Sequence, residues 1–533
     1  MDDIVIRGGQ LIDGSGAPAR RADLAIAGGR ISAISDRHAG GARREIDAAG
    51  QVVAPGFIDI HTHSDFTLPL NPRAESKIRQ GVTTEVLGNC GFSAAPALPG
   101  RVETLRDYLG ASAPWLEFRE TTFADYLDTF PAVSVNTVMQ VGHNTLRLMA
   151  MGMEDRAPRT AELALMQRLL AEALDAGALG LSSGLFTAPG TYAKPEEMKA
   201  LGEVLKSRGG GYSSHVRDEA NHVFEAVREA INVGETCGVH VQIAHLKLSG
   251  TDNWGGAAKL LAEIDAARAR GVRVDCDQYP YTAGSNPLRN LLPSWVQEGG
   301  LEAMLQRLGQ PAARERIRAE LAAHGLNNFG RIPSWDAVRI AISPQQEFVG
   351  RTIADIARAR GADPLDALCD YLIADRGHTR IVVTSMSEED VQEIIRSGNV
   401  LVGSDGTSLA PYGTTGQGKP HPRFYGTFPR VLGRYVRDLG LLSLPQGVYK
   451  MTGGSAAALG LKGRGLLREG YRADITVFDP QTIADRATYE DPHQYAAGIQ
   501  TVIVNGVVVI DAGEHNGSLP GQVLRRGSDL ALQ

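Results

Sequence analysis

Between residues 55 and 405, short apolar runs alternate with longer stretches of helical pattern, and this alternation constrains the fold more than any other feature. Apolar runs that end in polar clusters and precede helices are typical of repeated βα units. A (β/α)8 barrel needs eight parallel strands, so one candidate is surplus. We expect it to be Ile381–Thr384, and the pattern predicts a TIM-type (β/α)8 barrel, with an open doubly wound sheet as the alternative. The candidate strands are Gly56–Ile60, Val82–Leu87, Ser134–Val141, Ala178–Ser182, Gly211–Ser214, His240–Ala244, Val272–Cys276, Ile381–Thr384 and Val400–Gly403.

Both ends of the chain carry short β patterns separated by Gly and Asp turns, and Asn505-Gly506 is a strong hairpin signal. These segments predict a small β-sandwich domain built from residues 1–54 and 461–533, flanking a barrel domain of residues 55–460. Two separate caps are the alternative. The segments are Asp3–Arg7, Gly9–Ile12, Asp23–Ala27, Arg30–Ile34, Asp474–Phe478, Gln500–Asn505 and Gly506–Ile510.

The interval 286–344 is too long for a simple loop. It contains Trp295, Trp335 and an Arg/Ala/Glu-rich stretch, Ala312–Ala323, that has the pattern of an amphipathic helix. An insertion between late barrel strands lies at the rim where active sites are found. We therefore expect a helical insertion there, as a lid over the site or as a surface decoration.

The composition limits the partners. With 54 Lys+Arg, 61 Asp+Glu and a net charge of −7, the chain does not resemble a nucleic-acid or anionic-membrane binder, and a small-molecule partner is expected. No apolar run approaches 18 residues, and Met1-Asp2-Asp3-Ile4 is acidic where a secretion signal is basic. The 4 cysteines are too few for a disulfide scaffold, so we expect a cytoplasmic protein. Its oligomeric state cannot be predicted.

Histidines at the ends of predicted strands indicate a metal site. Pro55-Gly-Phe-Ile-Asp-Ile-His61-Thr-His63 places two imidazoles two residues apart, on one face of a strand terminus. His215 and His245 each end a strand and lie one βα unit apart, and Asp405 ends the last strand. Because parallel barrel strands end at the same rim, these five residues predict a common metal centre.

Cys90 ends the second predicted strand, in Val86-Leu-Gly-Asn-Cys-Gly. A thiolate is a good Zn²⁺ ligand, and this residue would face the same rim as the histidines. A lone cysteine in such a place is also commonly a small buried residue. Its position alone leaves both interpretations open.

With these motifs together, the sequence resembles the D-aminoacylases (N-acyl-D-amino-acid deacylases) of the amidohydrolase superfamily. The matching segments follow one another over nearly the whole chain. Besides Pro55–His63 they are Gly81-Val-Thr-Thr-Glu-Val-Leu-Gly-Asn-Cys-Gly, Gly142-His-Asn-Thr-Leu-Arg, Leu181-Ser-Ser-Gly-Leu, Ser214-His-Val-Arg-Asp-Glu, Ala244-His-Leu-Lys, Asp277-Gln-Tyr-Pro-Tyr, Gly403-Ser-Asp-Gly and His421-Pro-Arg-Phe-Tyr-Gly-Thr-Phe-Pro-Arg.

The resemblance implies a zinc enzyme in which a cysteine, here Cys90, takes the bridging position that a carboxylated lysine often holds in other amidohydrolases. It implies a firmly held zinc bound by Cys90, His215 and His245. It also implies a weaker second position at His61 and His63, with Cys90 shared, so one or two zinc ions are expected.

The implied reaction is hydrolysis of the amide bond of N-acyl-D-amino acids. Zinc activates a water and polarises the carbonyl, while Asp405 accepts the water's proton and returns it to the departing amine. The substrate carboxylate needs a cation, and Lys247 lies two residues beyond His245. The resemblance assigns Lys247 this role, helped by a tyrosine and a serine, which we identify as Tyr279 and Ser285.

Several assignments stay open. Tyr281 competes with Tyr279, and Arg423 and Arg430 are further candidates for binding the carboxylate. His143 is a candidate for supporting a site residue by contact, without a catalytic role. Preference among D-amino acids depends on the pocket wall, which includes Phe186, Tyr192 and parts of the insertion. Because no cationic cluster is evident there, we expect neutral or apolar D-amino acids to be favoured over acidic ones.

Two other functions compete. A cyclic-amide hydrolase of the same superfamily, such as a hydantoinase or dihydroorotase, usually needs a carboxylated lysine, and no lysine ends Ala178-Leu-Gly-Leu-Ser-Ser. A non-catalytic relative acting as a binding protein would typically have lost metal ligands. Here every expected ligand is present, which favours an enzyme.

Overall fold

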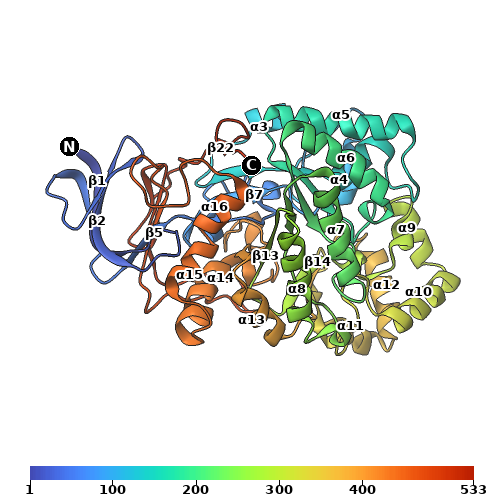
Figure 1. Cartoon of the computed structure of the whole chain (residues 1–533). Helices are drawn as coiled ribbons and strands as arrows, with labels where there is room; N and C mark the ends of the chain where they lie inside the picture. The colour runs from blue at the N-terminus through green and yellow to red at the C-terminus, as the bar shows by residue number, and fades with distance from the viewer. Residues whose placement is uncertain (533) are drawn as a thin grey trace.

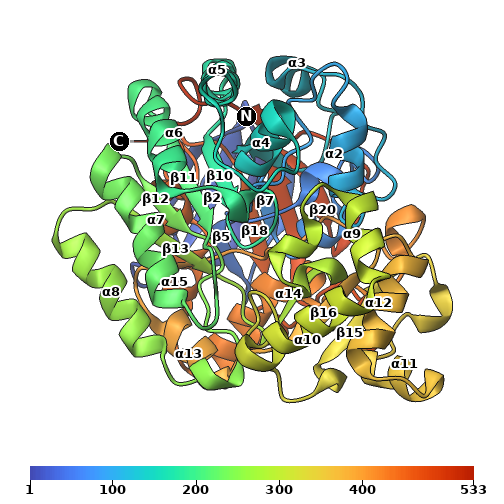
Figure 2. The same cartoon turned by 90° about the vertical axis from the view of Figure 1, so that its right-hand side faces the viewer.

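The computed structural model describes residues 1–532, and its centre is a ring of parallel strands (Figure 2). One six-stranded and one four-stranded sheet supply these strands, with β8 and β9 as two halves of a single strand. At one junction the Leu179 amide donates to the Met139 carbonyl (2.8 Å), and at the other the Asp405 amide donates to the His61 carbonyl (2.9 Å). The barrel prediction is confirmed. Its strands are β6 (Phe57–Asp59), β7 (Val82–Leu87), β8 (Asn136–Met139), β9 (Val141–Gly142), β10 (Gly180–Gly184), β11 (Gly211–His215), β12 (Val241–Ile243), β13 (Val274–Gln278) and β17 (Val400–Val402).

The helices between these strands cover the ring because each buries one apolar stripe. In α7 the buried residues Val223, Val227, Ala230 and Ile231 recur at the three- and four-residue spacing of one helix face. The helix ends at Gly238, whose φ of 71° is a conformation that glycine adopts without strain. The barrel helices are α4 (His143–Met151), α5 (Thr160–Ala176), α6 (Pro195–Arg208), α7 (Val223–Cys237), α8 (Ala257–Ala269) and α13 (Glu388–Arg396).

A nine-stranded sheet is built from both ends of the chain, at the left of Figure 1. Antiparallel pairing of β5 with β18 joins the two ends, so two separate caps are excluded. The expected hairpin at Asn505-Gly506 is confirmed, since Val504 pairs with Val507. The two strands expected within residues 3–12 are one strand, with a register shift between Ile6 and Gly9. The strands are β1 (Asp2–Leu11), β2 (Arg20–Ala27), β3 (Arg30–Ser35), β4 (Ala42–Asp47), β5 (Val52–Pro55), β18 (Ile475–Phe478), β19 (Ile499–Val504), β20 (Val507–Asp511) and β21 (Glu514–His515).

The chain leaves the barrel after β13, over residues 279–387, and returns to it at the barrel helix α13; this is a longer excursion than the interval 286–344. Three antiparallel strands lie here, in the order β14-β16-β15, so the surplus candidate Ile381–Thr384 is indeed outside the barrel. A hydrophobic cluster of its own, running from Leu288 to Val383, holds this inserted subdomain together. Its elements are β14 (Ala283–Pro287), α9 (Leu301–Leu308), α10 (Pro311–His324), β15 (Val338–Ile342), α11 (Ile353–Arg360), α12 (Pro364–Ala374) and β16 (Arg380–Thr384), with 3-10 turns η4 (Leu288–Leu291), η5 (Ser294–Gln297), η6 (Trp335–Ala337) and η7 (Gln346–Phe348).

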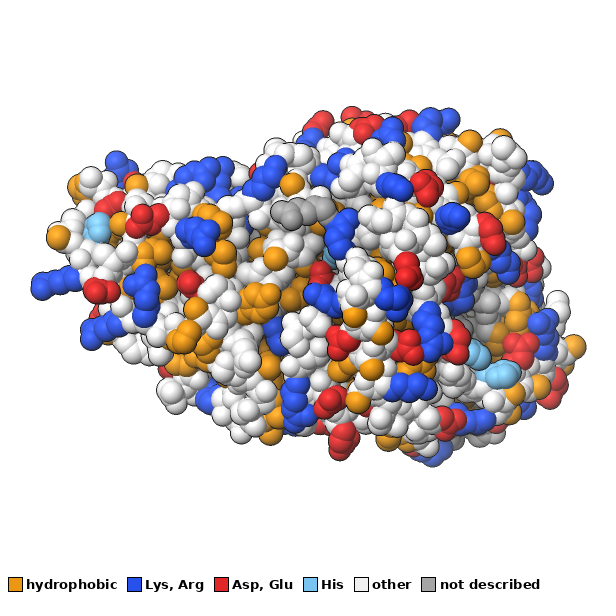
Figure 3. All heavy atoms as spheres, viewed as in Figure 1, with side chains coloured by type: hydrophobic (Ala, Val, Ile, Leu, Met, Phe, Trp, Pro, Cys, Tyr) orange, Lys and Arg blue, Asp and Glu red, His pale blue; other side chains and the backbone are white. Residues whose placement is uncertain are grey.

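On the face drawn in Figure 3, acidic and basic side chains are interspersed. Among the described residues, no helix combines the length and apolar character needed to span a bilayer. The remaining elements are α1 (Glu75–Ile78), α2 (Val102–Leu109), α3 (Phe123–Asp128), α14 (Arg423–Arg430), the π-helical η9 (Val431–Asp438), α15 (Leu444–Lys450), α16 (Gly453–Leu459), β22 (Val523–Leu524) and the turns η1 (Ser64–Phe66), η2 (Gly190–Tyr192), η3 (Thr251–Asn253) and η8 (Thr414–Gly416).

Candidate metal centre and active site

A small cavity of about 30 Å³ lies at the carboxyl ends of the barrel strands. Space of this size holds one or two water molecules, so a larger ligand requires the wall side chains to move. The wall combines residues of the barrel with residues of the inserted subdomain. The predicted site residues on it are His63, Cys90, His215, His245, Ser285 and Asp405.

The Cys90 thiol lies at the centre of the cluster. Its Sγ is 3.2 Å from Nε2 of His61 and 3.4 Å from Nε2 of His245. Burial alone would raise the pKa of this thiol, but the charges of His61 and His245 and a hydrogen bond with His215 hold it well below its usual range. A lowered pKa favours the thiolate form of Cys90, which is the form that binds metals.

Backbone strain coincides with the cluster. Cys90, His245 and Asp405 have φ angles of 55°, 35° and 46°, in the left-handed region that residues with a Cβ rarely adopt. Such outliers persist only where the surrounding structure enforces them, and they concentrate at functional sites. Each of these residues lies two or three positions after the end of a barrel strand, and each lines the small cavity.

His61 and His63 approach the cluster from the end of β6. Nδ1 of His61 is 3.2 Å from Oδ1 of Asp277, which fixes the ring orientation and leaves Nε2 facing Cys90. Nε2 of His63 is 3.2 Å from Oδ1 of Asp405. Burial disfavours the charged form of His61, but Asp277 and Cys90 raise its pKa well above the usual value.

Glu219 joins the other two histidines. Its carboxylate is 3.4 Å from Nε2 of His215 and 2.8 Å from Nδ1 of His245, and it forms a short ion pair with Nζ of Lys247. Against burial, Lys247 and the two histidines hold the pKa of Glu219 well below its usual range. Lys247 also lies 2.7 Å from Nδ1 of His245, so it contacts the cluster but does not line the cavity.

Arg423 forms a buried ion pair with Asp405, with 2.9 Å between Nη2 and Oδ2. Burial raises the pKa of Asp405, but Arg423 and His245 outweigh it and hold it well below the usual value. The Arg423 guanidinium lies 4.5 Å from the ring centre of Tyr279, and Nζ of Lys247 is 5.4 Å from it. Tyr279, not Tyr281, is thus beside the predicted carboxylate-binding lysine.

Three other predicted candidates lie apart from the cluster. The Tyr281 hydroxyl and Nη1 of Arg430 contact the carboxylate of Asp485, at 3.4 and 3.0 Å. His143 contacts Glu197 (2.7 Å) and none of the candidate ligands.

Arg380 is a cavity cation that sequence reasoning missed. It extends from β16 of the inserted subdomain to the wall beside Ser285, and its Nη1 donates to Ser112 (2.7 Å). Within the described part of the chain, no carboxylate lies within 4.0 Å of its guanidinium. Burial and the neighbouring Arg423 lower the pKa of Arg380 to about 10. It remains a cation at neutral pH, available to an anionic ligand.

Sequence reasoning missed three further contacts of the cluster: Glu219, Asp277 and Asn328, whose amide nitrogen is 3.2 Å from Nε2 of His215. Glu219 and Asp277 lie inside the motifs Ser214-His-Val-Arg-Asp-Glu and Asp277-Gln-Tyr-Pro-Tyr. These motifs do not indicate which side chains the two carboxylates contact. Asn328 lies in the inserted subdomain, and no sequence signal pointed to it.

The donors fit a transition metal. One ligand atom each from His61, Cys90, His245 and Asp405 lies within 4.8 Å of the others, and His215, Glu219 and His245 form a second such group. Zn–S and Zn–N bonds of ordinary length at a tetrahedral angle place the two ligand atoms about 3.5 Å apart. The measured separations around Cys90 are close to this value, and thiolate with imidazole is a donor set that zinc prefers.

Comparison with known proteins identifies the family of this chain. The amidohydrolase family model matches residues 44–510. The chain belongs to the amidohydrolase family. A D-aminoacylase from Alcaligenes xylosoxydans xylosoxydans is 40% identical over 98% of both chains. An N-acyl-D-aspartate deacylase from the same organism is 39% identical over 99% of this chain and 96% of its own.

Among solved structures, this amidohydrolase is similar to an N-acyl-D-glutamate deacylase from Bordetella bronchiseptica, which was crystallised with zinc and a phosphonate that mimics the tetrahedral intermediate. The identity is 37%, the TM-score is 0.82, and 98% of this chain and 99% of the other are covered. The resemblance noted from sequence motifs is thereby confirmed.

Proposed function

We propose that this amidohydrolase is a zinc-dependent deacylase that hydrolyses N-acyl-D-amino acids to a D-amino acid and a carboxylate. The observation that carries the proposal is the position of the Cys90 Sγ between His61 and His245, facing the same cavity as Asp405. The proposal also draws on similarity to deacylases along the whole chain.

In this proposal Cys90, His215 and His245 hold one zinc, and His61 and His63 with the shared Cys90 offer a second position. Bound there, zinc would polarise the amide carbonyl and lower the pKa of water. Asp277 and Glu219 orient the imidazoles through their second nitrogens.

Asp405 moves the protons. Its depressed pKa keeps it ionised at neutral pH, so it can accept a proton from the attacking water. It then returns that proton to the amine nitrogen as the C–N bond breaks. Arg423 orients the carboxylate and holds it opposite His63.

Lys247, Tyr279 and Ser285 form the proposed site for the substrate carboxylate. Because Lys247 is paired with Glu219, Arg380 is the cation on the cavity wall that is free to meet this carboxylate. Neutral or apolar side chains are then favoured, since no second unpaired cation lines the cavity within the described residues.

A second candidate is a preference for N-acyl-D-aspartate or N-acyl-D-glutamate. It is favoured by Arg380, if this residue binds an acidic side chain while Lys247 turns from Glu219 to the α-carboxylate.

We also infer a cytoplasmic setting, because all four cysteines are free and buried.

The test is hydrolysis of paired N-acetyl-D- and N-acetyl-L-amino acids (Met, Leu, Phe, Glu, Asp) by zinc-loaded protein, with detection of free amine. We expect release from the D forms alone, fastest for Met, Leu or Phe. Fastest release from Glu or Asp would select the second candidate. No release from any pair by zinc-loaded protein, with turnover of a hydantoin or dihydroorotate, would overturn the proposal.

A further inference from the structure

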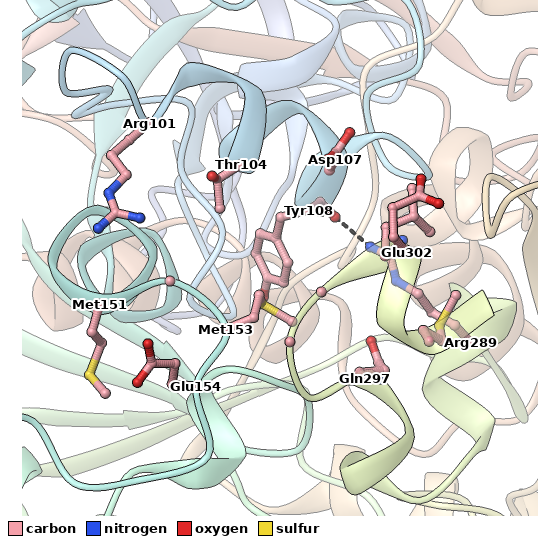
Figure 4. Close-up of a pocket in the computed structure, with 15 residues that line it drawn as sticks. Arg101, Thr104, Asp107, Tyr108, Met151, Met153, Glu154, Arg289, Gln297 and Glu302 are labelled. Atoms are coloured by element: carbon pink, nitrogen blue, oxygen red, sulfur yellow. Dashed lines mark hydrogen bonds between the residues drawn. The ribbon is translucent and has the colours of Figure 1, made fainter. Parts of the chain in front are cut away.

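A second cavity of about 440 Å³ lies between the barrel and the inserted subdomain. Its walls are α2, the loop after α4, and the segment from η4 to α9 (Figure 4). It is separate from the metal cluster, but the two cavities share a wall. Phe92 lines the small cavity and Tyr108 the large one, with ring centres 5.6 Å apart.

Arg289 extends into this second cavity and is only 7% exposed. Its Nη2 donates to the Tyr108 carbonyl and its Nη1 makes a long contact of 3.5 Å with the Gly377 carbonyl. Within residues 1–532, no carboxylate lies within 4.0 Å of its guanidinium, whereas most buried arginines are ion-paired. Arg289 is therefore a buried cation with no carboxylate in ion-pair contact, although Asp107 and Asp375 attract it from farther away.

Gln297 lies on the same wall and is 3% exposed. Its Nε2 atom is buried and has no hydrogen-bond partner among the described residues. Leaving such a donor unsatisfied is costly, so unpaired buried donors call for an explanation. A cation and an amide donor on one cavity wall match the two oxygens of a carboxylate.

The rest of the lining divides into apolar and acidic parts. Met151, Met153 and Met304 supply flexible apolar surface, which accommodates chains of varied shape. Two of the acidic residues at the margin already have partners: Glu154 is paired with Arg156 (2.6 Å) and Glu302 with an arginine of the inserted subdomain. Asp107 also lines the cavity and has no ion-pair partner among the described residues, but neither have Arg101 and Arg289, so the unpaired cations outnumber the unpaired carboxylate.

We propose that this second cavity binds a small carboxylate with an apolar chain, with the carboxylate on Arg289 and Gln297 and the chain among the methionines. A bound ligand would hold Tyr108, and through it Phe92, whose ring centre is 6.0 Å from that of His63. The inference rests on the cavity and does not depend on the reaction catalysed.

The test is equilibrium dialysis of labelled hexanoate against zinc-loaded protein, counting molecules bound per chain. We expect Arg289→Gln to bind one hexanoate fewer than the wild type, while retaining zinc. Lys247→Ala should keep this site, since its lysine is next to the metal cluster. Hexanamide and hexylammonium, with the same chain and no carboxylate, should not compete.

A second variant guards against misfolding of Arg289→Gln. Gln297→Glu replaces the free donor by a carboxylate beside Arg289, and should weaken hexanoate binding by about 10–100-fold. Equal hexanoate binding by the wild type and by either folded variant would overturn the proposal. Binding of hexylammonium in place of hexanoate would also overturn it.

Discussion

The barrel and the inserted subdomain contribute to one cavity in different ways. The barrel supplies every candidate metal ligand near the ends of its strands, and two of the imidazoles are held by a second partner, His61 by Asp277 and His245 by Glu219. The inserted subdomain supplies Ser285, Arg380 and Asn328, which are polar and cationic but form no metal-binding group. We therefore expect the barrel to supply the catalytic groups and the insertion to contribute to substrate recognition.

The two regions also differ in the structure that keeps their residues in place. The ligands are fixed by the backbone of a closed ring, with strained φ angles at Cys90, His245 and Asp405. The insertion has its own hydrophobic cluster and an antiparallel sheet. Changes to the metal ligands and Asp405 of the barrel should alter the catalytic rate or the metal content. Changes to the insertion should alter substrate affinity, and Lys247 is the barrel residue expected to act on affinity as well.

The largest effect is expected at Asp405. Asp405→Asn keeps the shape and removes the proton acceptor, so kcat should fall by about 10²–10⁴-fold with zinc retained. Steady-state kinetics with N-acetyl-D-methionine and metal analysis measure both quantities. Asp438→Asn, at a half-exposed surface carboxylate, is the control. Near-normal kcat in the Asp405 variant would remove this residue from proton transfer.

Cys90→Ala tests whether the barrel holds the metal through its thiolate. We expect loss of bound zinc and at least about a 100-fold loss of activity. Mutating a residue that only hydrogen-bonds to a metal ligand already lowers metal affinity or activity by about 10–100-fold. Cys276→Ala is the matched control, since Cys276 is also fully buried and on a barrel strand but belongs to none of the candidate metal-binding groups among the described residues. Equal zinc contents in both variants would make Cys90 an ordinary core residue.

Lys247→Ala and Arg380→Gln compare a barrel cation with an insertion cation. Each should raise KM for N-acetyl-D-methionine by about 10–100-fold, because the loss of a hydrogen bond to a charged group usually weakens binding by this factor. The effect on the uncharged amide of the same substrate should be small. Equal losses on the acid and the amide would mean that the residue does not bind the carboxylate.

The smallest effect on activity is expected from Leu368→Ala, in the core of the insertion. Removing this fully buried side chain should cost about 2–5 kcal/mol of stability. Zinc content and kcat at 25 °C should stay near the wild-type values. The matched barrel change, Leu181→Ala, should promote zinc release in urea. Zinc loss from the Leu368 variant without denaturant would contradict the division between the two regions.

The sequence was informative where local pattern and strand direction suffice. The residues ending parallel strands, such as His215 and His245, converge because all barrel strands end at one rim. The helix expected at Ala312–Ala323 is confirmed as α10, and Val82–Leu87 matches β7 in full. The site residues followed from the same rule, while their assigned roles remain predictions.

The sequence was uninformative where a contact depends on distant chain segments. Lys247 follows His245 by two residues, yet its ion pair with Glu219 was invisible in the pattern. The choice between Tyr279 and Tyr281 could not be made, because Pro280 between them interrupts the strand alternation. Arg380 directly precedes Ile381–Thr384, the strand predicted to be surplus to the barrel, so the sequence pattern does not predict its place on the cavity wall.

The most direct test of the metal-dependent barrel centre is a zinc titration of metal-free protein. Zinc would be removed with a chelator and added back stepwise, with bound metal and hydrolysis of N-acetyl-D-methionine measured on the same samples. We predict no activity without zinc, and activity that returns with bound zinc in the wild type but not in Cys90→Ala. Full activity in the metal-free protein, or equal recovery in Cys90→Ala, would contradict the account.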